Sequence, residues 1–266
     1  MPTPEPVLVA RLRDAGCVFA EEEATLLGAA SDDPGVVEAL VARRVAGEPL
    51  EHLLGWAQFA GLRVLVGPGV FVPRRRTEHL LDQATARLAG RSEPVVVDLC
   101  CGSGAIALAL AARVSLGELH AADVDPAAVA CARLNLGSAG GSVHEGDLLD
   151  ALPSRLRGRV DVLVANVPYV PTPALATMPP EARDHEPRVA LDGGADGLDV
   201  VRRVAAAVAS WLVPGGWVLV ETSAAQAPPA AALFRAAGLD PVVEVAADGT
   251  HVVAARSRRA GTASGC

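Results

Sequence analysis

The hydrophobic positions at the start of the chain recur at helical spacing. They predict helices over residues 5–16 and 20–30, and a third helix that ends at Gly47. Asp32 or Asp33 is the expected N-cap of this third helix, because a short polar side chain here precedes a proline and an apolar run. The chain therefore begins as a small helical unit.

The pattern changes in the next stretch, GEPLEHLLGWAQFAGLRVLVGPGVFVPRRR. Two short apolar runs, around Phe59 and over residues 64–66, are broken by glycine and proline, which predicts a hairpin or an extended connector. We therefore divide the chain into four parts: a helical N-terminal domain over residues 1–55, a hairpin or connector over 56–76, an α/β domain over 77–256 and a disordered tail over 257–266.

From residue 77 onward, β-branched apolar runs alternate with helical patterns, which predicts an α/β fold with a doubly wound, mostly parallel sheet. Ligands of such sheets bind beyond the carboxyl ends of the strands. Residues 241–257 hold two further strands joined by Asp248-Gly249, which predicts an antiparallel hairpin at the end. The expected strands lie at residues 94–101, 117–125, 141–147, 159–169 and 217–223, and the expected helices at 78–90, 104–114, 126–137, 197–216 and 229–239.

Composition and charge exclude several classes of function. All 23 basic residues are arginine, and a net charge of -8 argues against a protein that coats nucleic acid. The five cysteines form no C-x-x-C pair and have no ligand spacing with the six histidines, so no metal site is expected. An odd cysteine count, no signal peptide and no apolar run of about 18 residues predict a soluble protein of the reducing cytoplasm, with no membrane partner.

The stretch VVVDLCCGSGAIALALA predicts a strand, a glycine-rich turn and a helix. Gly102 and Gly104 permit a tight bend and the close approach of a ligand. Asp98 ends the strand, where a carboxylate would repel a pyrophosphate and attract a cationic amino group. S-adenosylmethionine has an ammonium and a sulfonium and no phosphate, so it fits this position better than a dinucleotide. For the glycines alone, an ordinary strand-to-helix turn remains the alternative.

Two more aspartates end the next two strands. Asp123 can accept hydrogen bonds from both ribose hydroxyls, and Asp147 can reach an adenine amino group. Each aspartate alone could be a helix cap or a solvated turn, but three at successive strand ends favour an adenosyl site. We expect the cofactor to contact these aspartates and their loop neighbours, namely Asp98, Cys100, Gly102, Gly104, Asp123, Val124, Asp147, Leu148 and Asn166.

The stretch VLVANVPYVPT holds the only tyrosine of the chain and one of its asparagines. A planar amide nitrogen is a poor nucleophile, and an enzyme can help it by accepting hydrogen bonds from both of its N–H groups. Asn166 Oδ1 and the Val167 carbonyl are the expected acceptors, because Pro168 holds Val167 in an extended conformation. Tyr169 offers a flat face to a planar substrate or to the sulfonium. A strand that ends in a proline turn with a core tyrosine is the alternative.

These motifs resemble those of the HemK/PrmC group, the protein-(glutamine-N5) methyltransferases. The resemblance implies a class I S-adenosylmethionine-dependent methyltransferase, with a Rossmann-like sheet and a small helical N-terminal domain that recognises the substrate. It also implies methyl transfer to a glutamine side-chain amide in a protein, typically a translation release factor. The motifs that carry it are Gly47-Glu-Pro, Val72-Pro-Arg74 with Thr77-Glu78, the loop 98–104, the Asn166–Tyr169 motif, EPRVALDGGADGL at 186–198, and Glu221 with Gln226.

The resemblance assigns roles to residues of two motifs. The catalytic residues it implies are Asn166, Val167, Pro168 and Tyr169. The same four residues, together with Arg74 and Thr77, are the implied substrate-binding residues.

Three residues depart from the family pattern. Val167 stands where the family usually has a proline, Arg76 where it usually has a glutamate, and Cys100 where the loop usually has its first glycine. Together with Arg74 and Arg75, Arg76 places positive charge beside the expected substrate entrance, either to meet an acidic partner or as a solvated corner. These departures indicate a divergent member whose protein substrate could differ from a release factor.

Three other functions are compatible with parts of the pattern. An adenine N6-methyltransferase of DNA or RNA uses similar chemistry at a similar motif, but nucleic acid is an unlikely direct substrate of so acidic a chain. A nicotinamide oxidoreductase is disfavoured by Asp98 and by the Asn-x-Pro-Tyr motif. A binding module without catalysis remains if the cofactor is not held.

Overall fold

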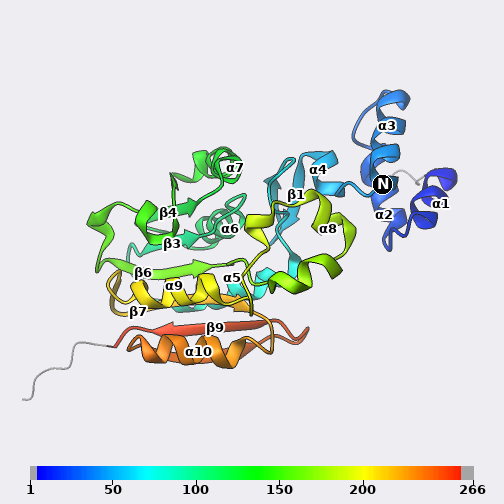
Figure 1. Cartoon of the computed structure of the whole chain (residues 1–266). Coiled ribbons are helices and arrows are strands. Elements are labelled where there is room, and N and C mark those ends of the chain that lie inside the picture. The colour runs from blue at the N-terminus through cyan, green and yellow to red at the C-terminus, as the bar shows by residue number, and fades with distance from the viewer. Residues whose placement is uncertain (1–4, 259–266) are drawn as a thin grey trace, which may run out of the picture.

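The computed structural model describes residues 5–258, which form a helical N-terminal domain beside an α/β domain (Figure 1). Asp33 caps α3 by accepting a hydrogen bond from the Gly35 N–H at 2.8 Å, as the sequence predicts. Residues 259–266 of the predicted disordered tail lie outside the described residues. The N-terminal helices are α1 (Pro6–Asp14), α2 (Ala20–Gly28), α3 (Pro34–Val45) and α4 (Leu50–Leu54), of which α4 is an addition to the predicted elements.

A buried arginine ties the N-terminal helices to the α/β domain. Arg44 Nε donates to Glu23 Oε2 at 2.6 Å, and Arg44 Nη1 donates to the Glu48 carbonyl at 3.1 Å. Arg44 Nη1 also lies 3.5 Å from Glu181 Oε2, which belongs to α8 (Pro180–His185) of the α/β domain. A buried guanidinium is stable only where several acceptors surround it, so these contacts fix the position of α3 against α8.

The predicted hairpin is present between the two domains. Strands β1 (Trp56–Phe59) and β2 (Leu62–Leu65) pair antiparallel, with Trp56 opposite Leu65. Phe59 and Val64 are fully buried in the same apolar cluster as the helix that follows the hairpin. The short 3₁₀ turn η1 (Arg75–Thr77) then leads into that helix, α5 (Glu78–Leu88).

The α/β domain is built on one seven-stranded sheet with the order β5-β4-β3-β6-β7-β9-β8. The first five strands in that order run parallel, and β9 pairs antiparallel with both β7 and β8. This confirms the predicted mostly parallel sheet with an antiparallel last hairpin. The strands are β3 (Val95–Leu99), β4 (Glu118–Asp123), β5 (Ser142–Glu145), β6 (Val160–Ala165), β7 (Leu212–Thr222), β8 (Asp240–Val245) and β9 (His251–Arg256).

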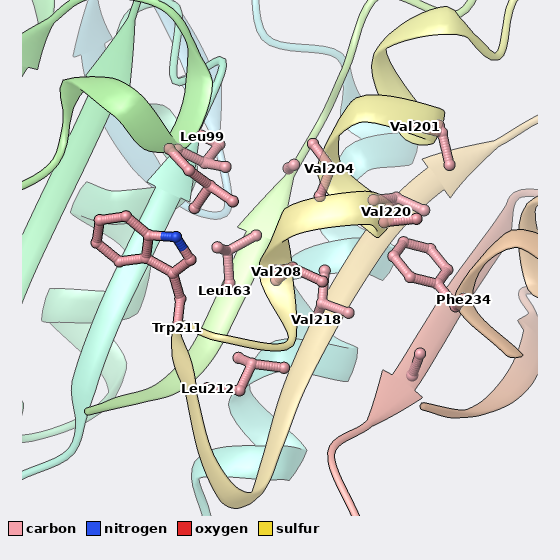
Figure 2. Packing of buried hydrophobic residues seen from close by; sticks show 14 of the residues in the cluster. Leu99, Leu163, Val201, Val204, Val208, Trp211, Leu212, Val218, Val220 and Phe234 are labelled. Atoms are coloured by element: carbon pink, nitrogen blue, oxygen red, sulfur yellow. The ribbon is translucent and has the colours of Figure 1, made fainter. Parts of the chain in front are cut away.

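Helices cover both faces of this sheet, because successive strand residues point to opposite faces and both sets are apolar. One face packs against α5, α6 (Ala105–Arg113) and α7 (Pro126–Leu136). The other packs against α9 (Asp199–Val208) and α10 (Ala227–Ala236). Figure 2 shows Val201, Val204 and Val208 of α9 beside Leu163, Val218 and Val220 of β6 and β7.

The C-terminal end of one helix was predicted at the wrong position. Residues 197–216 were expected to form a helix, but α9 ends at Val208 and β7 begins at Leu212. The backbone of this segment forms hydrogen bonds with a strand of the sheet: the Val160 N–H donates to the Trp211 carbonyl at 3.0 Å. Trp211 is nearly fully buried, so the apolar residues that resemble a helix face belong to the core beneath the strands (Figure 2).

Two structural features are absent from residues 5–258. No helix in this range is long and apolar enough to cross a membrane. In the same range, no three histidine, cysteine, aspartate or glutamate side chains lie close enough together to hold a metal ion.

Candidate active site

A cavity of about 270 Å³ lies beyond the carboxyl ends of β3, β4 and β6. This is where a doubly wound sheet is expected to bind its ligand. The sequence-predicted residues on its wall are Arg74, Thr77, Cys100, Gly102, Asp123, Val124, Asp147, Leu148, Asn166, Val167, Pro168 and Tyr169. The structure thus brings together residues that are far apart in the sequence.

The glycine loop between β3 and α6 is held in left-handed backbone conformations. Cys100, Gly102 and Gly104 have φ values of 53°, 54° and 76°. Gly104 does not line the cavity; a Cβ there would lie 3.3 Å from the side chains of Ala132 and Leu136, so this glycine permits close packing of the loop against α7. Cys100 has a positive φ, which a residue with a Cβ adopts less readily than glycine. This is a physical reason for the glycine that the family usually has at this position.

Asp98 lies beneath the glycine loop and is absent from the cavity wall. Its Oδ2 accepts a hydrogen bond from the Ala107 N–H at 3.1 Å, and its Oδ1 is buried without a partner among the described residues. Burial raises the pKa of Asp98 to about 7. A direct contact of Asp98 with the cofactor stays a prediction. Its observed hydrogen bond holds the first turn of α6, which follows the glycine loop.

Asp123 combines support of the loop with access to the cavity. Its Oδ2 accepts from the Gly102 N–H at 2.8 Å, and its Oδ1 accepts from the Asp125 N–H at 3.0 Å. Burial raises the pKa of this carboxyl group, and the two backbone N–H groups oppose that rise. Each carboxylate oxygen keeps a second lone pair, so Asp123 can still accept both ribose hydroxyls as predicted.

Asp147, Val124 and Leu148 also line the cavity. Asp147 is an exposed carboxylate whose Oδ2 accepts from Arg203 Nη2 at 2.5 Å. Val124 is 49% exposed although it is apolar, which suits a position that a flat apolar ring covers. These residues offer an apolar surface and a carboxylate acceptor, and adenine binding here stays a prediction. The ion pair of Asp147 with Arg203 was not predicted from the sequence.

Asn166 follows β6 and has an unsatisfied acceptor. Its Nδ2 lies 3.4 Å from Thr77 Oγ1, while its Oδ1 is buried with no partner among the described residues. The amide is thereby oriented with its donor toward Thr77, which leaves the oxygen for a ligand. Four of the five such orphan atoms lie at the carboxyl ends of β3, β6 and β7, in Asp98, Asn166, Glu221 and Thr222. Buried polar atoms are rarely left unpaired, so this concentration indicates a ligand-binding site.

The Val167 carbonyl is the second predicted acceptor. No hydrogen bond among residues 5–258 uses this carbonyl, and Val167 lines the cavity. The valine side chain is 2% exposed and packs in the apolar core with Leu198. Valine in place of proline therefore changes the side chain that packs into the apolar core. The backbone carbonyl remains the same.

The loop EPRVALDGGADGL fixes the backbone of the asparagine–tyrosine motif. Gln226 Nε2 donates to the Tyr169 carbonyl at 2.8 Å and to the Asp196 carbonyl at 3.0 Å. A Cβ on Gly197 would lie 2.2 Å from the Tyr169 carbonyl oxygen and 2.2 Å from Gln226 Nε2, so only glycine fits there. Gln226 and Gly197 belong to the motifs, but no role could be assigned to them from the sequence, because their contact joins distant segments of the chain.

Tyr169 is held by two charged side chains. Arg76 Nη2 donates to Tyr169 Oη at 2.8 Å, and Tyr169 Oη donates to Glu221 Oε1 at 3.2 Å. Arg76 Nε also donates to Glu221 Oε1 at 3.4 Å. Burial and the Glu221 carboxylate raise the pKa of Tyr169 to about 12, so the phenol stays protonated.

The arginine triplet is therefore not the free cationic patch that the sequence suggests. Arg74 Nη2 donates to Glu186 Oε2 at 2.6 Å, and its guanidinium stacks 4.9 Å from the Phe71 ring centroid. Arg76 contacts Tyr169 and Glu221. Within the triplet, only Arg75 is exposed and has no ion pair with the described residues. The partners of Arg74 and Arg76 lie 112 and 145 residues away in the sequence, which explains why spacing did not reveal them.

The remaining residues that line the cavity are largely apolar. They come from the hairpin, from the segment before η1 and from the loop after β6, which sequence patterns did not bring together. They include Phe59, Phe71, Pro73, Val170, Met178, Pro187 and Val189.

The sequence is similar to those of known methyltransferases. Residues 61–178 match the family described as Methyltransferase small domain. A protein of Streptomyces coelicolor named release factor glutamine methyltransferase is 46% identical over 184 residues, which cover 68% of this chain and 65% of the relative. A protein of the same name from Geobacter sulfurreducens is 40% identical, with 75% of this chain and 69% of the relative covered.

A third relative has a different name. The 4-amino-L-phenylalanine/4-methylamino-L-phenylalanine methyltransferase of Streptomyces pristinaespiralis is 40% identical, with 74% of this chain and 69% of the relative covered. Among solved structures, a methyltransferase from Pyrococcus furiosus superposes with a TM-score of 0.54 at 15% identity, covering 75% of this chain and 90% of that one. This structural likeness supports the fold. The chain belongs to the release factor glutamine methyltransferase family, a group of S-adenosylmethionine-dependent enzymes with the class I methyltransferase fold.

Proposed function

We propose that this enzyme transfers the methyl group of S-adenosylmethionine to the side-chain amide nitrogen of a glutamine in a protein, with a translation release factor as the first candidate. One observation carries the proposal. Asn166 Oδ1 is a buried acceptor with no partner among the described residues. It follows β6 beside a cavity that is also lined by Val167, whose carbonyl accepts no hydrogen bond within residues 5–258. Two acceptors at this place match the two N–H groups of a primary amide.

Several residues fit the cofactor in the other half of the cavity. The glycine loop allows close approach, Asp123 offers ribose acceptors, and Val124 offers apolar surface. Bound S-adenosylmethionine supplies a methyl group on a positively charged sulfur, which takes the electron pair of the broken S–C bond. The buried Asp98 carboxylate adds negative potential below the loop when it is ionised.

The asparagine motif acts on the nitrogen. The amide nitrogen provides the electron pair of the new N–C bond and becomes positive before it releases a proton to solvent. Asn166 Oδ1 and the Val167 carbonyl accept its two N–H groups, and these hydrogen bonds strengthen as the positive charge grows. Thr77 orients the Asn166 amide for this task. Arg76 and Glu221 fix the Tyr169 ring at the edge of the substrate.

A second candidate is the side-chain nitrogen of a free amino acid. The relative from Streptomyces pristinaespiralis bears the name of such an enzyme and is as similar to this chain as the Geobacter sulfurreducens relative. The Arg76 guanidinium on the cavity wall is the structural observation that favours it, since a free amino acid has a carboxylate. The names of these three relatives do not support the nucleic-acid alternative. A release-factor substrate would place the reaction in the cytoplasm, where translation takes place.

The proposal is tested by incubating the purified enzyme and labelled S-adenosylmethionine with the release factors of the same organism. We expect label on one glutamine, located by mass spectrometry, and its loss in Asn166→Ala while cofactor binding persists. Label on another protein from a cell extract would reject the release factor but keep glutamine methylation. Label only on 4-amino-L-phenylalanine would favour the second candidate, and label on nucleic acid would overturn both.

A further inference from the structure

The cavity wall carries three arginines, of which Arg76 has the weakest contact with an acid. Arg74 and Arg203 lie 2.6 and 2.5 Å from their carboxylate partners, whereas Arg76 Nε lies 3.4 Å from Glu221 Oε1. Its other contact, at 2.8 Å, is with the neutral Tyr169 hydroxyl. The positive charge of Arg76 is therefore the least compensated of the three.

The guanidinium of Arg76 is also fixed in place with donors to spare. A guanidinium has five N–H donors, and the contacts with Tyr169 and Glu221 use two of them. No other acceptor among the described residues receives a hydrogen bond from Arg76. Its side chain is 53% exposed, and the residue lines the cavity. Because two contacts already hold the group, little side-chain entropy is lost when a ligand binds the remaining donors.

A carboxylate is the ligand that suits this group best. Two N–H groups of a guanidinium bind the two oxygens of a carboxylate in one plane, and the bond is charge-assisted. Tyr169 connects this position with the catalytic motif, since it contacts Arg76 and lies three residues after Asn166. A carboxylate on Arg76 and a nitrogen on Asn166 would thus belong to neighbouring groups of one substrate.

We propose that Arg76 is a specificity-determining residue that binds a carboxylate next to the methyl-accepting nitrogen of the substrate. This inference rests on the proposed methyl transfer to nitrogen. Two sources supply that chemistry: an aspartate or glutamate beside the glutamine in a polypeptide, and the α-carboxylate of a free amino acid. The neighbouring Arg75 is exposed, lies off the cavity wall and provides a matched control on the same turn.

The test measures methyl transfer from labelled S-adenosylmethionine to paired probes. The peptide Ac-Ala-Gly-Gln-Gly-Ala-NH2 is compared with versions that have aspartate on either side of the glutamine. In the second arm, 4-amino-L-phenylalanine is compared with its carboxamide. We expect one carboxylate-bearing probe to exceed its neutral partner in kcat/KM by at least about tenfold, the effect of one charge-assisted hydrogen bond. The arm that shows this ratio identifies the source.

Variants assign the preference to the residue. In Arg76→Gln the ratio should fall to about one, while Arg75→Gln should keep the wild-type ratio. Since Arg76→Gln leaves Glu221 buried without its cation, the double variant Arg76→Gln/Glu221→Gln provides a charge-neutral version if the single variant unfolds. Equal rates for charged and neutral probes with the wild type, or a preference that survives in both Arg76 variants, overturns the inference and leaves the proposed function intact. No transfer to any probe by an enzyme that binds the cofactor counts against the proposed function itself.

Discussion

Asn135 Nδ2 donates a hydrogen bond to the Ser103 carbonyl of the glycine loop at 2.8 Å. The same amide exchanges hydrogen bonds with the backbone of Leu65 in β2, donating to its carbonyl at 2.9 Å and accepting from its N–H at 2.8 Å. Asn135 is the other asparagine of the chain besides Asn166, and its side chain joins the hairpin to the glycine loop. Both asparagines are therefore close to one cavity: Asn166 lines it, and Asn135 holds Ser103, which also lines it.

Replacing this bridge should weaken both the fold and cofactor binding. Asn135→Ala removes three hydrogen bonds to the backbone of Leu65 and Ser103, so we expect a loss of about 2–4 kcal/mol in the free energy of unfolding. S-adenosylmethionine affinity should fall about tenfold, because the loop loses its support. Chemical denaturation and calorimetry measure the two effects. Unchanged affinity in the folded variant would restrict Asn135 to a structural role.

Asp98→Asn should show how the buried carboxyl group opposes stability. The pKa of Asp98 in the folded state, about 7, lies above the ordinary value of 3.8. Between these two pH values the folded state holds more protons than the unfolded state, so this group's contribution to stability falls as pH rises through that window and is lowest above pH 7. The variant should therefore exceed the wild type by about 1–3 kcal/mol at pH 8 and by much less near pH 4. Denaturation at the two pH values checks this.

The same variant separates stability from cofactor binding. Asp98→Asn removes a negative charge below the glycine loop, so S-adenosylmethionine should bind more weakly at pH 8 in the variant than in the wild type. An affinity that is identical in both proteins would mean that Asp98 only supports the loop.

Asn166→Ala should lower kcat by roughly 10²–10³, since a preorganised contact to the transition state is lost. Affinity for S-adenosylmethionine should stay nearly unchanged, because the glycine loop and Asp123 remain. Asn166→Asp keeps an acceptor and should be milder. Single-turnover methylation measures the effect, and a wild-type rate in Asn166→Ala would make the motif structural.

Val167→Pro restores the residue that the family usually has and should preserve methylation. The Val167 carbonyl remains, and the Val167 N–H donates no hydrogen bond among the described residues that proline would remove. Loss of some core packing should cost about 1 kcal/mol of stability or less. Steady-state kinetics check this, and inactivity with intact cofactor binding would show that the valine side chain itself is required.

Cys100→Gly should stabilise the protein by about 1 kcal/mol, because a non-glycine residue is strained at a φ of 53°. Thermal unfolding measures the gain, with Cys131→Ala as the control for loss of a buried thiol elsewhere. A destabilised Cys100→Gly variant would show that packing of the thiol outweighs the backbone strain.

The sequence predicted those features that depend on local patterns. The strand–turn–helix around Gly102 and the aspartates at the strand ends followed from spacing, and the Asn166 motif was recognisable as a unit. The contacts Gln226–Tyr169 and Arg76–Glu221 were not predictable, because each joins segments that only the folded sheet brings together. The prediction of the boundary between α9 and β7 was wrong for another reason. A strand that is buried on both faces is a continuous apolar run, which cannot be distinguished by its pattern from a buried helix segment.

Arg44 connects the N-terminal helices to a segment that lines the candidate active site. This guanidinium holds α2 through Glu23 and reaches α8 through Glu181. The segment around α8 supplies Met178 and Pro187 to the cavity wall. We therefore expect a protein that binds the N-terminal domain to change the position of this part of the cavity wall, so that binding of a partner and the shape of the cavity are coupled.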